Sequence, residues 1–161
     1  MKIEQWEIER VKPYDKNPRR NDKAVEAVAK SIREFGFRQP IVVDAAGVIV
    51  VGHTRYKAAL KLGLKTVPVH VAADLTPQQA RAYRIADNRT NEAAEWDIDL
   101  LPIELGELRD DGADLKLLGF TDKELAEYLR EFDTDLDDGA ASAEGAADTI
   151  RCPKCGHEFP V

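Results

Sequence analysis

Residues 48–59, Val48-Ile49-Val50-Val51-Gly52-His53-Thr54-Arg55-Tyr56-Lys57-Ala58-Ala59, decide the fold of the first half of this chain. They predict a short apolar strand that passes through one glycine directly into a helix. A helix N-terminus leaves backbone N–H groups unpaired and carries a partial positive charge. Gly52 lets a ligand approach the backbone, and Arg55 adds a forked cation that suits phosphate oxygens. The stretch therefore predicts a phosphate-binding turn; the alternative is an ordinary strand–turn–helix with Arg55 in solvent.

The flanking sequence predicts a small mixed sheet with helices around this turn. Apolar runs predict strands at residues 3–11, 40–44, 48–51 and 66–71, with a hairpin turn at 45–47. Helical spacing of apolar residues predicts helices from Asn21 or Asp22 to Phe35, from Thr54 to Leu62, and from Thr76 to Asn91. Pro68 indicates an edge or a bulge, because proline cannot donate to a strand ladder. We expect an α+β domain over residues 1–95.

The second half of the chain predicts helices followed by a linker and a tail. One helix is expected over Asp97–Arg109, and a capping box at Thr121-Asp122-Lys123-Glu124 opens another. Together they predict a helical extension over residues 96–132. Residues 133–149 are rich in Asp, Ala and Gly and predict a flexible acidic linker. Residues 150–161 are expected to form a short separate tail.

The tail carries Cys152-Pro153-Lys154-Cys155-Gly156-His157, which is similar to one knuckle of a zinc ribbon. Structural zinc takes four protein ligands, and this tail offers Cys152, Cys155 and His157. We therefore expect a zinc site that a second copy completes in a homodimer. The alternative is a tail with two reduced thiols and no metal.

Charge is distributed unevenly along the 161 residues, whose formal net charge is −7. Residues 1–91 hold 17 Lys and Arg against 10 Asp and Glu, whereas residues 92–161 hold 6 against 20. A basic half suits phosphate-bearing ligands, either nucleotides or DNA. An acidic half repels a DNA backbone or shields the basic half. No apolar run approaches the roughly 20 residues that span a bilayer, and no signal peptide is evident, so we expect a soluble, cytoplasmic protein without membrane contact.

Three blocks of sequence carry a resemblance to a known family. They are Asn17-Pro18-Arg19, then Arg38-Gln39-Pro40-Ile41-Val42-Val43 followed by residues 52–59, and last Asp87-Asn88-Arg89-Thr90-Asn91. In this order, over residues 3–92, they resemble the N-terminal domain of ParB-type partition proteins, whose fold is shared with sulfiredoxin. The resemblance implies a ParB/sulfiredoxin-like fold and a pocket for a nucleoside triphosphate, CTP in chromosomal ParB proteins, with magnesium on the phosphates.

The resemblance also implies which residues line that pocket. The residues expected at the nucleotide phosphates are Arg19, Gly52, His53, Thr54, Arg55 and Asn88, and Asp87 is the expected magnesium ligand. Carboxylate and amide oxygens suit a hard cation, and arginines offset phosphate charge. Independently of the family, His53 can cap the helix, and Asp87 and Asn88 can simply end one.

The chain also departs from the family pattern. His53-Thr54 stands where partition proteins usually have Glu-Arg, and Asn91 stands where they usually have arginine, so phosphate-facing cations are missing. Sulfiredoxins carry a catalytic cysteine at the position of His53, and residues 1–91 contain no cysteine, which excludes sulfiredoxin activity. Beyond residue 92 we see no basic recognition helix and expect no helix-turn-helix domain.

The sequence is compatible with three functions. The first is a ParB-like nucleotide-binding module in DNA-associated processes of a phage or mobile element, where such domains are often joined to or encoded beside DNA methyltransferases. The second is an enzyme, either a metal-dependent nuclease or a nucleoside triphosphatase. The third is a non-catalytic adaptor that holds a DNA methyltransferase.

Overall fold

The computed structural model describes residues 2–143, 149–151 and 158–160. The chain divides into two compact units. The first comprises Met1–Asp97 with Asp114–Thr121, and the second comprises Ile98–Ala113 with Asp122–Val161. The segment expected as one helical extension, residues 96–132, is thus shared between the two units.

The first unit is built on a four-stranded mixed sheet, as the sequence predicts. Its strands are β1 (Ile3–Glu7), β2 (Ile41–Val43), β3 (Ile49–Val51) and β4 (Thr66–Val71), in the order β1-β4-β2-β3. β4 pairs antiparallel with β1 and parallel with β2, and β2 and β3 form the expected antiparallel hairpin. Gly47 supplies the positive φ of 81° that this tight turn requires.

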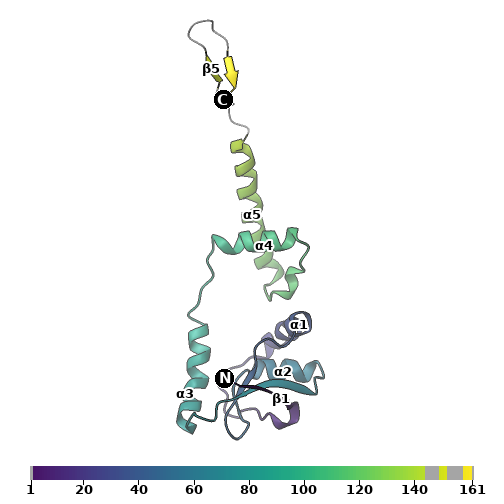
Figure 1. Cartoon of the computed structure of the whole chain (residues 1–161), viewed down its shortest axis with the longest axis vertical. Helices are drawn as coiled ribbons and strands as arrows, with labels where there is room; N and C mark the ends of the chain where they lie inside the picture. Colours follow the sequence, from purple (N-terminus) through teal and green to yellow (C-terminus); the bar gives the residue numbers. More distant parts are fainter. Residues whose placement is uncertain (1, 144–148, 152–157, 161) are drawn as a thin grey trace. The chain divides into compact units, whose positions relative to one another are not determined.

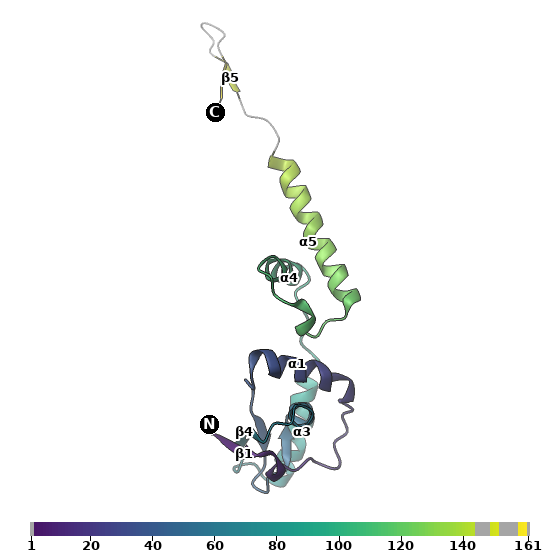
Figure 2. The ribbon, with the colours of Figure 1, turned by 90° about the vertical axis from the view of Figure 1, so that its right-hand side faces the viewer.

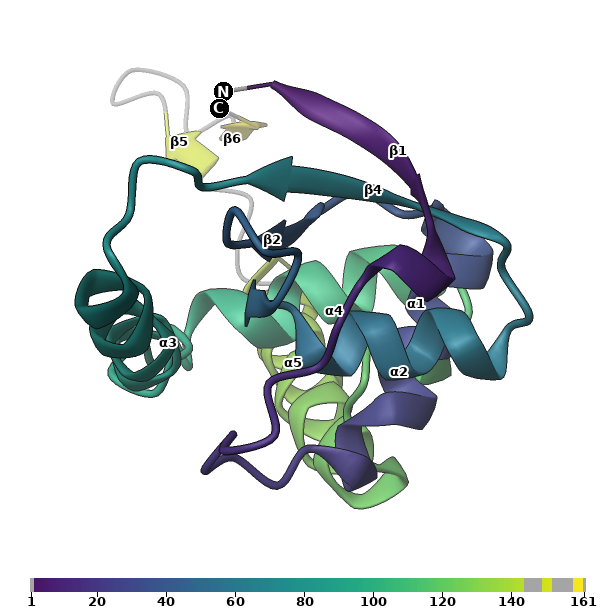
Figure 3. The same ribbon diagram turned by 90° about the horizontal axis from the view of Figure 1, so that it is seen from below.

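Two helices pack on one face of the sheet (Figures 1 and 3). They are α1 (Val25–Phe35) and α2 (His53–Lys61), which contact each other, and α2 also contacts β2. Two short 3-10 helices, η1 (Ile8–Arg10) and η2 (Asp22–Ala24), lie in the segment between β1 and α1. Gly36 ends α1 with a φ of 78°, as expected of a glycine at a helix C-terminus.

The core lies between the sheet and these helices. Its buried members are Trp6, Ile8, Val11, Ile41, Val43, Ile49, Ala59, Val67 and Val69. The apolar runs form strands here because their β-branched side chains are buried against the helices. The small side chain of Ala59 lets α2 pack closely against the sheet. This packing fixes the point at which β3 ends and α2 begins.

Helix α3 (Pro77–Asn91) contacts β3. It opens on the expected capping box, in which Thr76 Oγ1 accepts from Gln79 N–H and Gln79 Oε1 accepts from Thr76 N–H. Pro77 occupies the first turn, where its missing N–H costs nothing. The first unit also contains η3 (Leu115–Leu117), which contacts α1.

The second unit consists of two helices and a short hairpin. Helix α4 (Leu100–Asp110) packs on α5 (Asp122–Ala143), and β5 (Thr149–Arg151) pairs with β6 (Glu158–Pro160). Leu101, Leu105, Leu125 and Phe132 are buried. Among the described residues, no helix is long and apolar enough to cross a bilayer.

Two local expectations differ from the structure. β4 is a central strand rather than an edge, but β2 pairs only with Val69–Val71, so β4 has a single neighbour at Pro68. The missing N–H of Pro68 is therefore tolerated there. Helix α5 continues to Ala143, into the segment expected as a flexible linker over 133–149 (Figure 2). The expected zinc ligands Cys152, Cys155 and His157 lie outside the described residues.

Candidate phosphate-binding pocket

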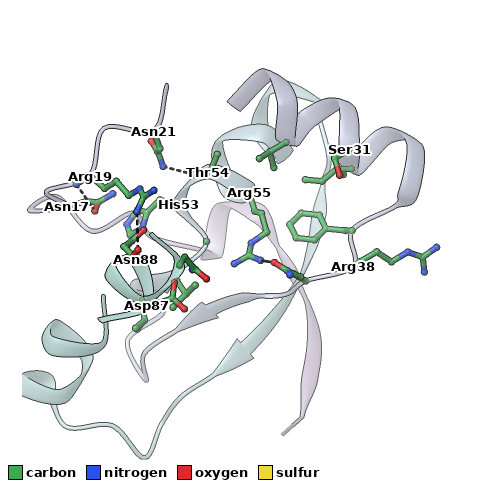
Figure 4. A pocket seen from close by; sticks show the side chains of 18 of the residues that line it. Asn17, Arg19, Asn21, Ser31, Arg38, His53, Thr54, Arg55, Asp87 and Asn88 are labelled. Atoms are coloured by element: carbon green, nitrogen blue, oxygen red, sulfur yellow. Dashed lines mark hydrogen bonds between the residues drawn. The ribbon is translucent and has the colours of Figure 1, made fainter. Parts of the chain in front are cut away.

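A pocket of about 600 Å³ opens in the first unit at the N-terminus of α2 (Figure 4). Its lining includes every residue expected at the phosphates or the magnesium: Arg19, Gly52, His53, Thr54, Arg55, Asp87 and Asn88. Three separate segments supply them: the loop before α1, the β3–α2 turn with the first turn of α2, and the end of α3. The tertiary fold therefore brings together all of these residues.

Gly52 shapes the turn at the centre of the pocket. Its φ of 106° and ψ of 24° are conformations that side-chain-bearing residues rarely adopt. A Cβ built on Gly52 would lie 3.2 Å from Arg55 Nε and 3.4 Å from Ile41 Cα. The first turn of α2 contains no acidic residue. The backbone N–H groups at this helix start thus face the pocket without a competing carboxylate on their own helix.

Arg55 lies over Gly52 and is half-buried. Its Nη1 donates to Gln39 Oε1, a neutral acceptor on the segment before β2. Burial lowers the pKa of Arg55 below its ordinary value, and the negative charge of Asp87 offsets part of that lowering. Among the described residues, no carboxylate oxygen comes within 4.0 Å of the Arg55 guanidinium nitrogens. The pocket therefore holds a partly desolvated cation without an acidic partner.

Arg19 reaches the pocket from the loop before α1. Its Nη1 lies 3.1 Å from Glu92 Oε1 and donates, at 3.5 Å, to the backbone carbonyl oxygen of Asn88. The backbone N–H of Arg19 donates to Asn17 Oδ1 at 3.3 Å, an Asx-type contact that shapes the loop. Unlike Arg55, Arg19 is therefore engaged by an acidic side chain.

Asp87 and Asn88 line the opposite wall, at the end of α3. Asn88 Nδ2 donates to the backbone carbonyl oxygen of Arg84 at 2.7 Å, so the side-chain amide is held in place. One carboxylate and one amide oxygen suit Mg²⁺, which usually binds one or two carboxylates together with substrate phosphates. The residues present fit a phosphate-bound magnesium. In the described part of the chain, no group of three or more His, Cys, Asp or Glu could hold a metal by itself.

The side chains of His53 and Thr54 form hydrogen bonds with the segment between β1 and α1. His53 Nε2 accepts from Tyr14 N–H at 3.2 Å, and Thr54 Oγ1 accepts from Asn21 Nδ2 at 3.0 Å. Burial and the nearby positive charge of Arg84 lower the pKa of His53 to about 4. His53 is thus neutral at pH 7 and brings no positive charge to the pocket.

The lowered pKa of His53 predicts a loss of stability in mild acid. The unfolded chain protonates His53 near its ordinary pKa of 6.5, whereas the folded chain resists protonation until about pH 4. Because the unfolded state binds the proton first, we expect the free energy of unfolding to fall as the pH drops through this window. Because solvent screens this partly exposed group, the expected loss is reduced to about 1–2 kcal/mol. Urea unfolding between pH 7.5 and 4.5 measures it.

His53→Gln isolates this effect, because the variant has no group to titrate in that window. Its unfolding free energy is expected to vary less with pH than that of the wild-type chain. His70→Gln is the matched control, since His70 lies on β4 and contacts the backbone of Lys2 rather than the pocket. An identical pH profile for the wild type and His53→Gln would contradict the expectation.

Several further lining residues are not among those expected at the phosphates or the magnesium. These are Asn17, Asn21, Ser31, Arg38, Gln39 and Asn91, together with apolar residues of α1 and Phe37. Arg38 and Gln39 stand in the central block of the family pattern, which was the available signal for them. Asn21 is only 7% exposed and its Oδ1 has no hydrogen-bond partner among the described residues. No sequence pattern indicates that burial.

The fold and the pocket define a small α+β domain with an anion-suited site at a strand–helix turn. Residues 1–88 match the family model of the ParB N-terminal domain. The chain therefore belongs to the ParB N-terminal domain family, which confirms the family expected from the three sequence blocks.

Individual relatives agree with this assignment. YnaK of Escherichia coli, a ParB-like nuclease domain-containing protein, is 35% identical over 80 residues, which are 49% of this chain and 92% of YnaK. The chromosome-partitioning protein Spo0J of Thermus thermophilus is 36% identical over 121 residues, which are 72% of this chain but 41% of Spo0J. This chain thus spans less than half the length of that partition protein.

Among solved structures, the fold is similar to that of C-terminally truncated chromosome-partitioning protein ParB from Caulobacter crescentus complexed with CTP-γ-S. The two are 24% identical with a TM-score of 0.59, and the match covers 90% of this chain and 94% of the other. This likeness supports the fold.

The expectation that no helix-turn-helix follows the first domain is wrong. Residues 99–154 match the ParB-methyltransferase HTH domain. The expectation rested on charge, because residues 99–154 contain 16 acidic and six basic side chains. Charge on the surface does not decide how helices pack; the buried positions, such as Leu105 and Leu125, do. The match also crosses the boundaries expected at residues 132 and 149.

Proposed function

We propose that the first unit binds a nucleoside triphosphate, CTP or another, in the pocket at the start of α2. The phosphates lie against the backbone N–H groups that follow Gly52, and Arg55 and Arg19 offset their charge. The volume of about 600 Å³ lies within the range of small-molecule sites. The similarity in fold to a ParB complexed with CTP-γ-S supports the same class of ligand.

The observation that carries this proposal is the state of Arg55. Burying a cation without an opposite charge is costly, and proteins normally pair such groups. Arg55 is half-buried, has a lowered pKa, and among the described residues its guanidinium donates a hydrogen bond to the neutral side chain of Gln39 and to no carboxylate. An anionic ligand in the adjoining pocket would supply the missing opposite charge and would offset the free-energy cost of desolvating the Arg55 guanidinium.

Magnesium is part of the same proposal. Asp87 and the side-chain oxygen of Asn88 would hold it, and the ion would neutralise the charge of the phosphates. Asp87 lies in the pocket and acts electrostatically on Arg55. Bound magnesium would therefore meet the negative charge of Asp87, and bound phosphate would meet the positive charge of Arg55.

A second candidate function is an adaptor for a DNA methyltransferase. The match of residues 99–154 to a methyltransferase-associated helix-turn-helix family favours it. The two functions are compatible, because the residues that line the pocket all precede residue 99, where the helix-turn-helix match begins. A nuclease is less well supported, since the described residues contain no metal-binding group of three or more acidic, histidine or cysteine side chains.

Titration of the full chain with CTP, ATP and GTP in the presence of Mg²⁺ tests the proposal. We expect saturable binding of at least one triphosphate by calorimetry. The matching nucleoside is expected to bind at least about tenfold more weakly, because it lacks the groups that meet Arg55 and the helix start.

Two results would count against nucleotide binding at this site. One is the absence of a heat signal and of thermal stabilisation with all three triphosphates. The other is equal affinity for a triphosphate and its nucleoside, which would place recognition away from the phosphates. Either result would leave the adaptor as the better supported function.

A further inference from the structure

We infer that Glu92 is an internal competitor for Arg19, because its carboxylate offsets the positive charge of Arg19 and so lowers the attraction between this arginine and a bound phosphate. The inference rests on the proposed function and adds a residue that sets the affinity of the same site. Glu92 does not line the pocket itself but forms the C-terminal cap of α3.

The contacts of Arg19 show how it is held in the ligand-free chain. Nη1 is the only side-chain nitrogen of Arg19 that makes a hydrogen bond within the described residues. It meets both Glu92 Oε1 and the Asn88 carbonyl oxygen, the latter at the negative end of the α3 dipole. The Arg19 side chain is therefore drawn toward the end of α3 by two negative groups.

The Glu92 carboxylate has a second arginine available. Its Oε2 accepts from Arg89 Nη1 at 3.3 Å, on the same turn of α3. If a phosphate takes Arg19, Arg89 still pairs with the carboxylate, so Glu92 is not left as an unpaired charge. This arrangement keeps the cost of displacement low, and Arg19 moves between two anions rather than out into solvent.

The expected size of the effect follows from the exposure of the pair. The Arg19 and Glu92 side chains are 44% and 50% exposed, and exposed ion pairs contribute little. Removing the competitor is therefore expected to tighten triphosphate binding by about two- to fivefold. If Glu92 instead positions Arg19 for the ligand, removing the Glu92 carboxylate is expected to weaken triphosphate binding.

A calorimetric titration with CTP, ATP and GTP in Mg²⁺, on the full chain and its variants, tests the inference. We expect Glu92→Gln to bind the triphosphate about two- to fivefold more tightly than wild type. The gain is expected to disappear when Glu92→Gln is combined with Arg19→Ala. Glu95→Gln is the matched control, because it removes the same charge from an exposed position three residues further along the chain, beyond the end of α3.

The possible results separate this inference from the function on which it rests. Wild-type binding with no gain in Glu92→Gln, or with an equal gain in Glu95→Gln or in the Arg19→Ala background, overturns the inference and leaves nucleotide binding intact. Weaker binding by Glu92→Gln overturns it in favour of a positioning role. No binding by either wild type or Glu92→Gln overturns both.

Discussion

Arg55→Ala is expected to weaken triphosphate binding by about ten- to a hundredfold. A hydrogen bond to a charged group contributes about 1.5–3 kcal/mol, and each 1.4 kcal/mol corresponds to a factor of ten in affinity. Arg55 is expected near the top of this range, because it is half-buried and forms no ion pair with a carboxylate within 4.0 Å among the described residues. Calorimetric titration with the triphosphate and Mg²⁺ measures the change.

Two further variants show whether the loss comes from the guanidinium at this position. Arg33→Ala removes the same side chain from an exposed site on α1 outside the pocket and is expected to leave the affinity unchanged. Arg55→Lys keeps the charge but not the planar fork, and an intermediate affinity is expected. Thermal unfolding of each variant confirms that it folds. Wild-type affinity in folded Arg55→Ala would exclude Arg55 from the site.

The candidate pocket could largely be predicted from sequence, because local geometry carries most of the signal. An apolar strand followed by glycine and a helix start fixes where unpaired N–H groups point, and this needs no knowledge of distant segments. Residues 19, 87 and 88 were predicted only through the ordered blocks of the family resemblance. The spacing of residues along the chain does not by itself predict that three separate segments meet in one pocket.

The contacts that hold the pocket together could not be predicted. Arg84 reads as one more surface cation of α3, yet it is 6% exposed. Its Nε donates to the Ile49 carbonyl oxygen at 2.9 Å, and its guanidinium stacks over the ring of Tyr14 at 4.0 Å. The sequence likewise gives no sign that His53 accepts a hydrogen bond from the backbone N–H of Tyr14. Both depend on tertiary contacts between segments 35 or more residues apart.

The helix-turn-helix was missed for a different reason. The acidic charge of residues 99–154 argues against a DNA-binding domain, although folding depends on the buried apolar positions of this segment. The same acidic residues also made the segment after Phe132 look like a linker, while the structure continues α5 to Ala143. Composition indicates what a surface will attract, and it is a weaker guide to which residues are helical.

Gly106→Ala is expected to destabilise the second unit by about 2 kcal/mol. From sequence alone the opposite is expected, because alanine is favoured over glycine by about 1 kcal/mol inside a helix. In the structure, a Cβ on Gly106 would clash with the ring atoms Cδ1 and Cε1 of Phe132, which is 8% exposed in the α4–α5 contact. Overpacking of this kind costs about 1–3 kcal/mol or more and outweighs the gain in helix propensity. Urea unfolding of the full chain, followed by far-UV circular dichroism, measures it.

A second substitution distinguishes the clash from other effects of the added methyl group. Phe132→Leu shortens the side chain that the methyl group meets, so Gly106→Ala is expected to cost much less in the Phe132→Leu background than in the wild type. Such a coupling between two sites in contact is the signature of a shared packing constraint. A more stable Gly106→Ala variant, or the same loss in both backgrounds, would show that α4 and α5 do not approach through Gly106. Because Gly106 and Phe132 meet in the contact between α4 and α5, the destabilisation is expected to reach both helices rather than one helix turn.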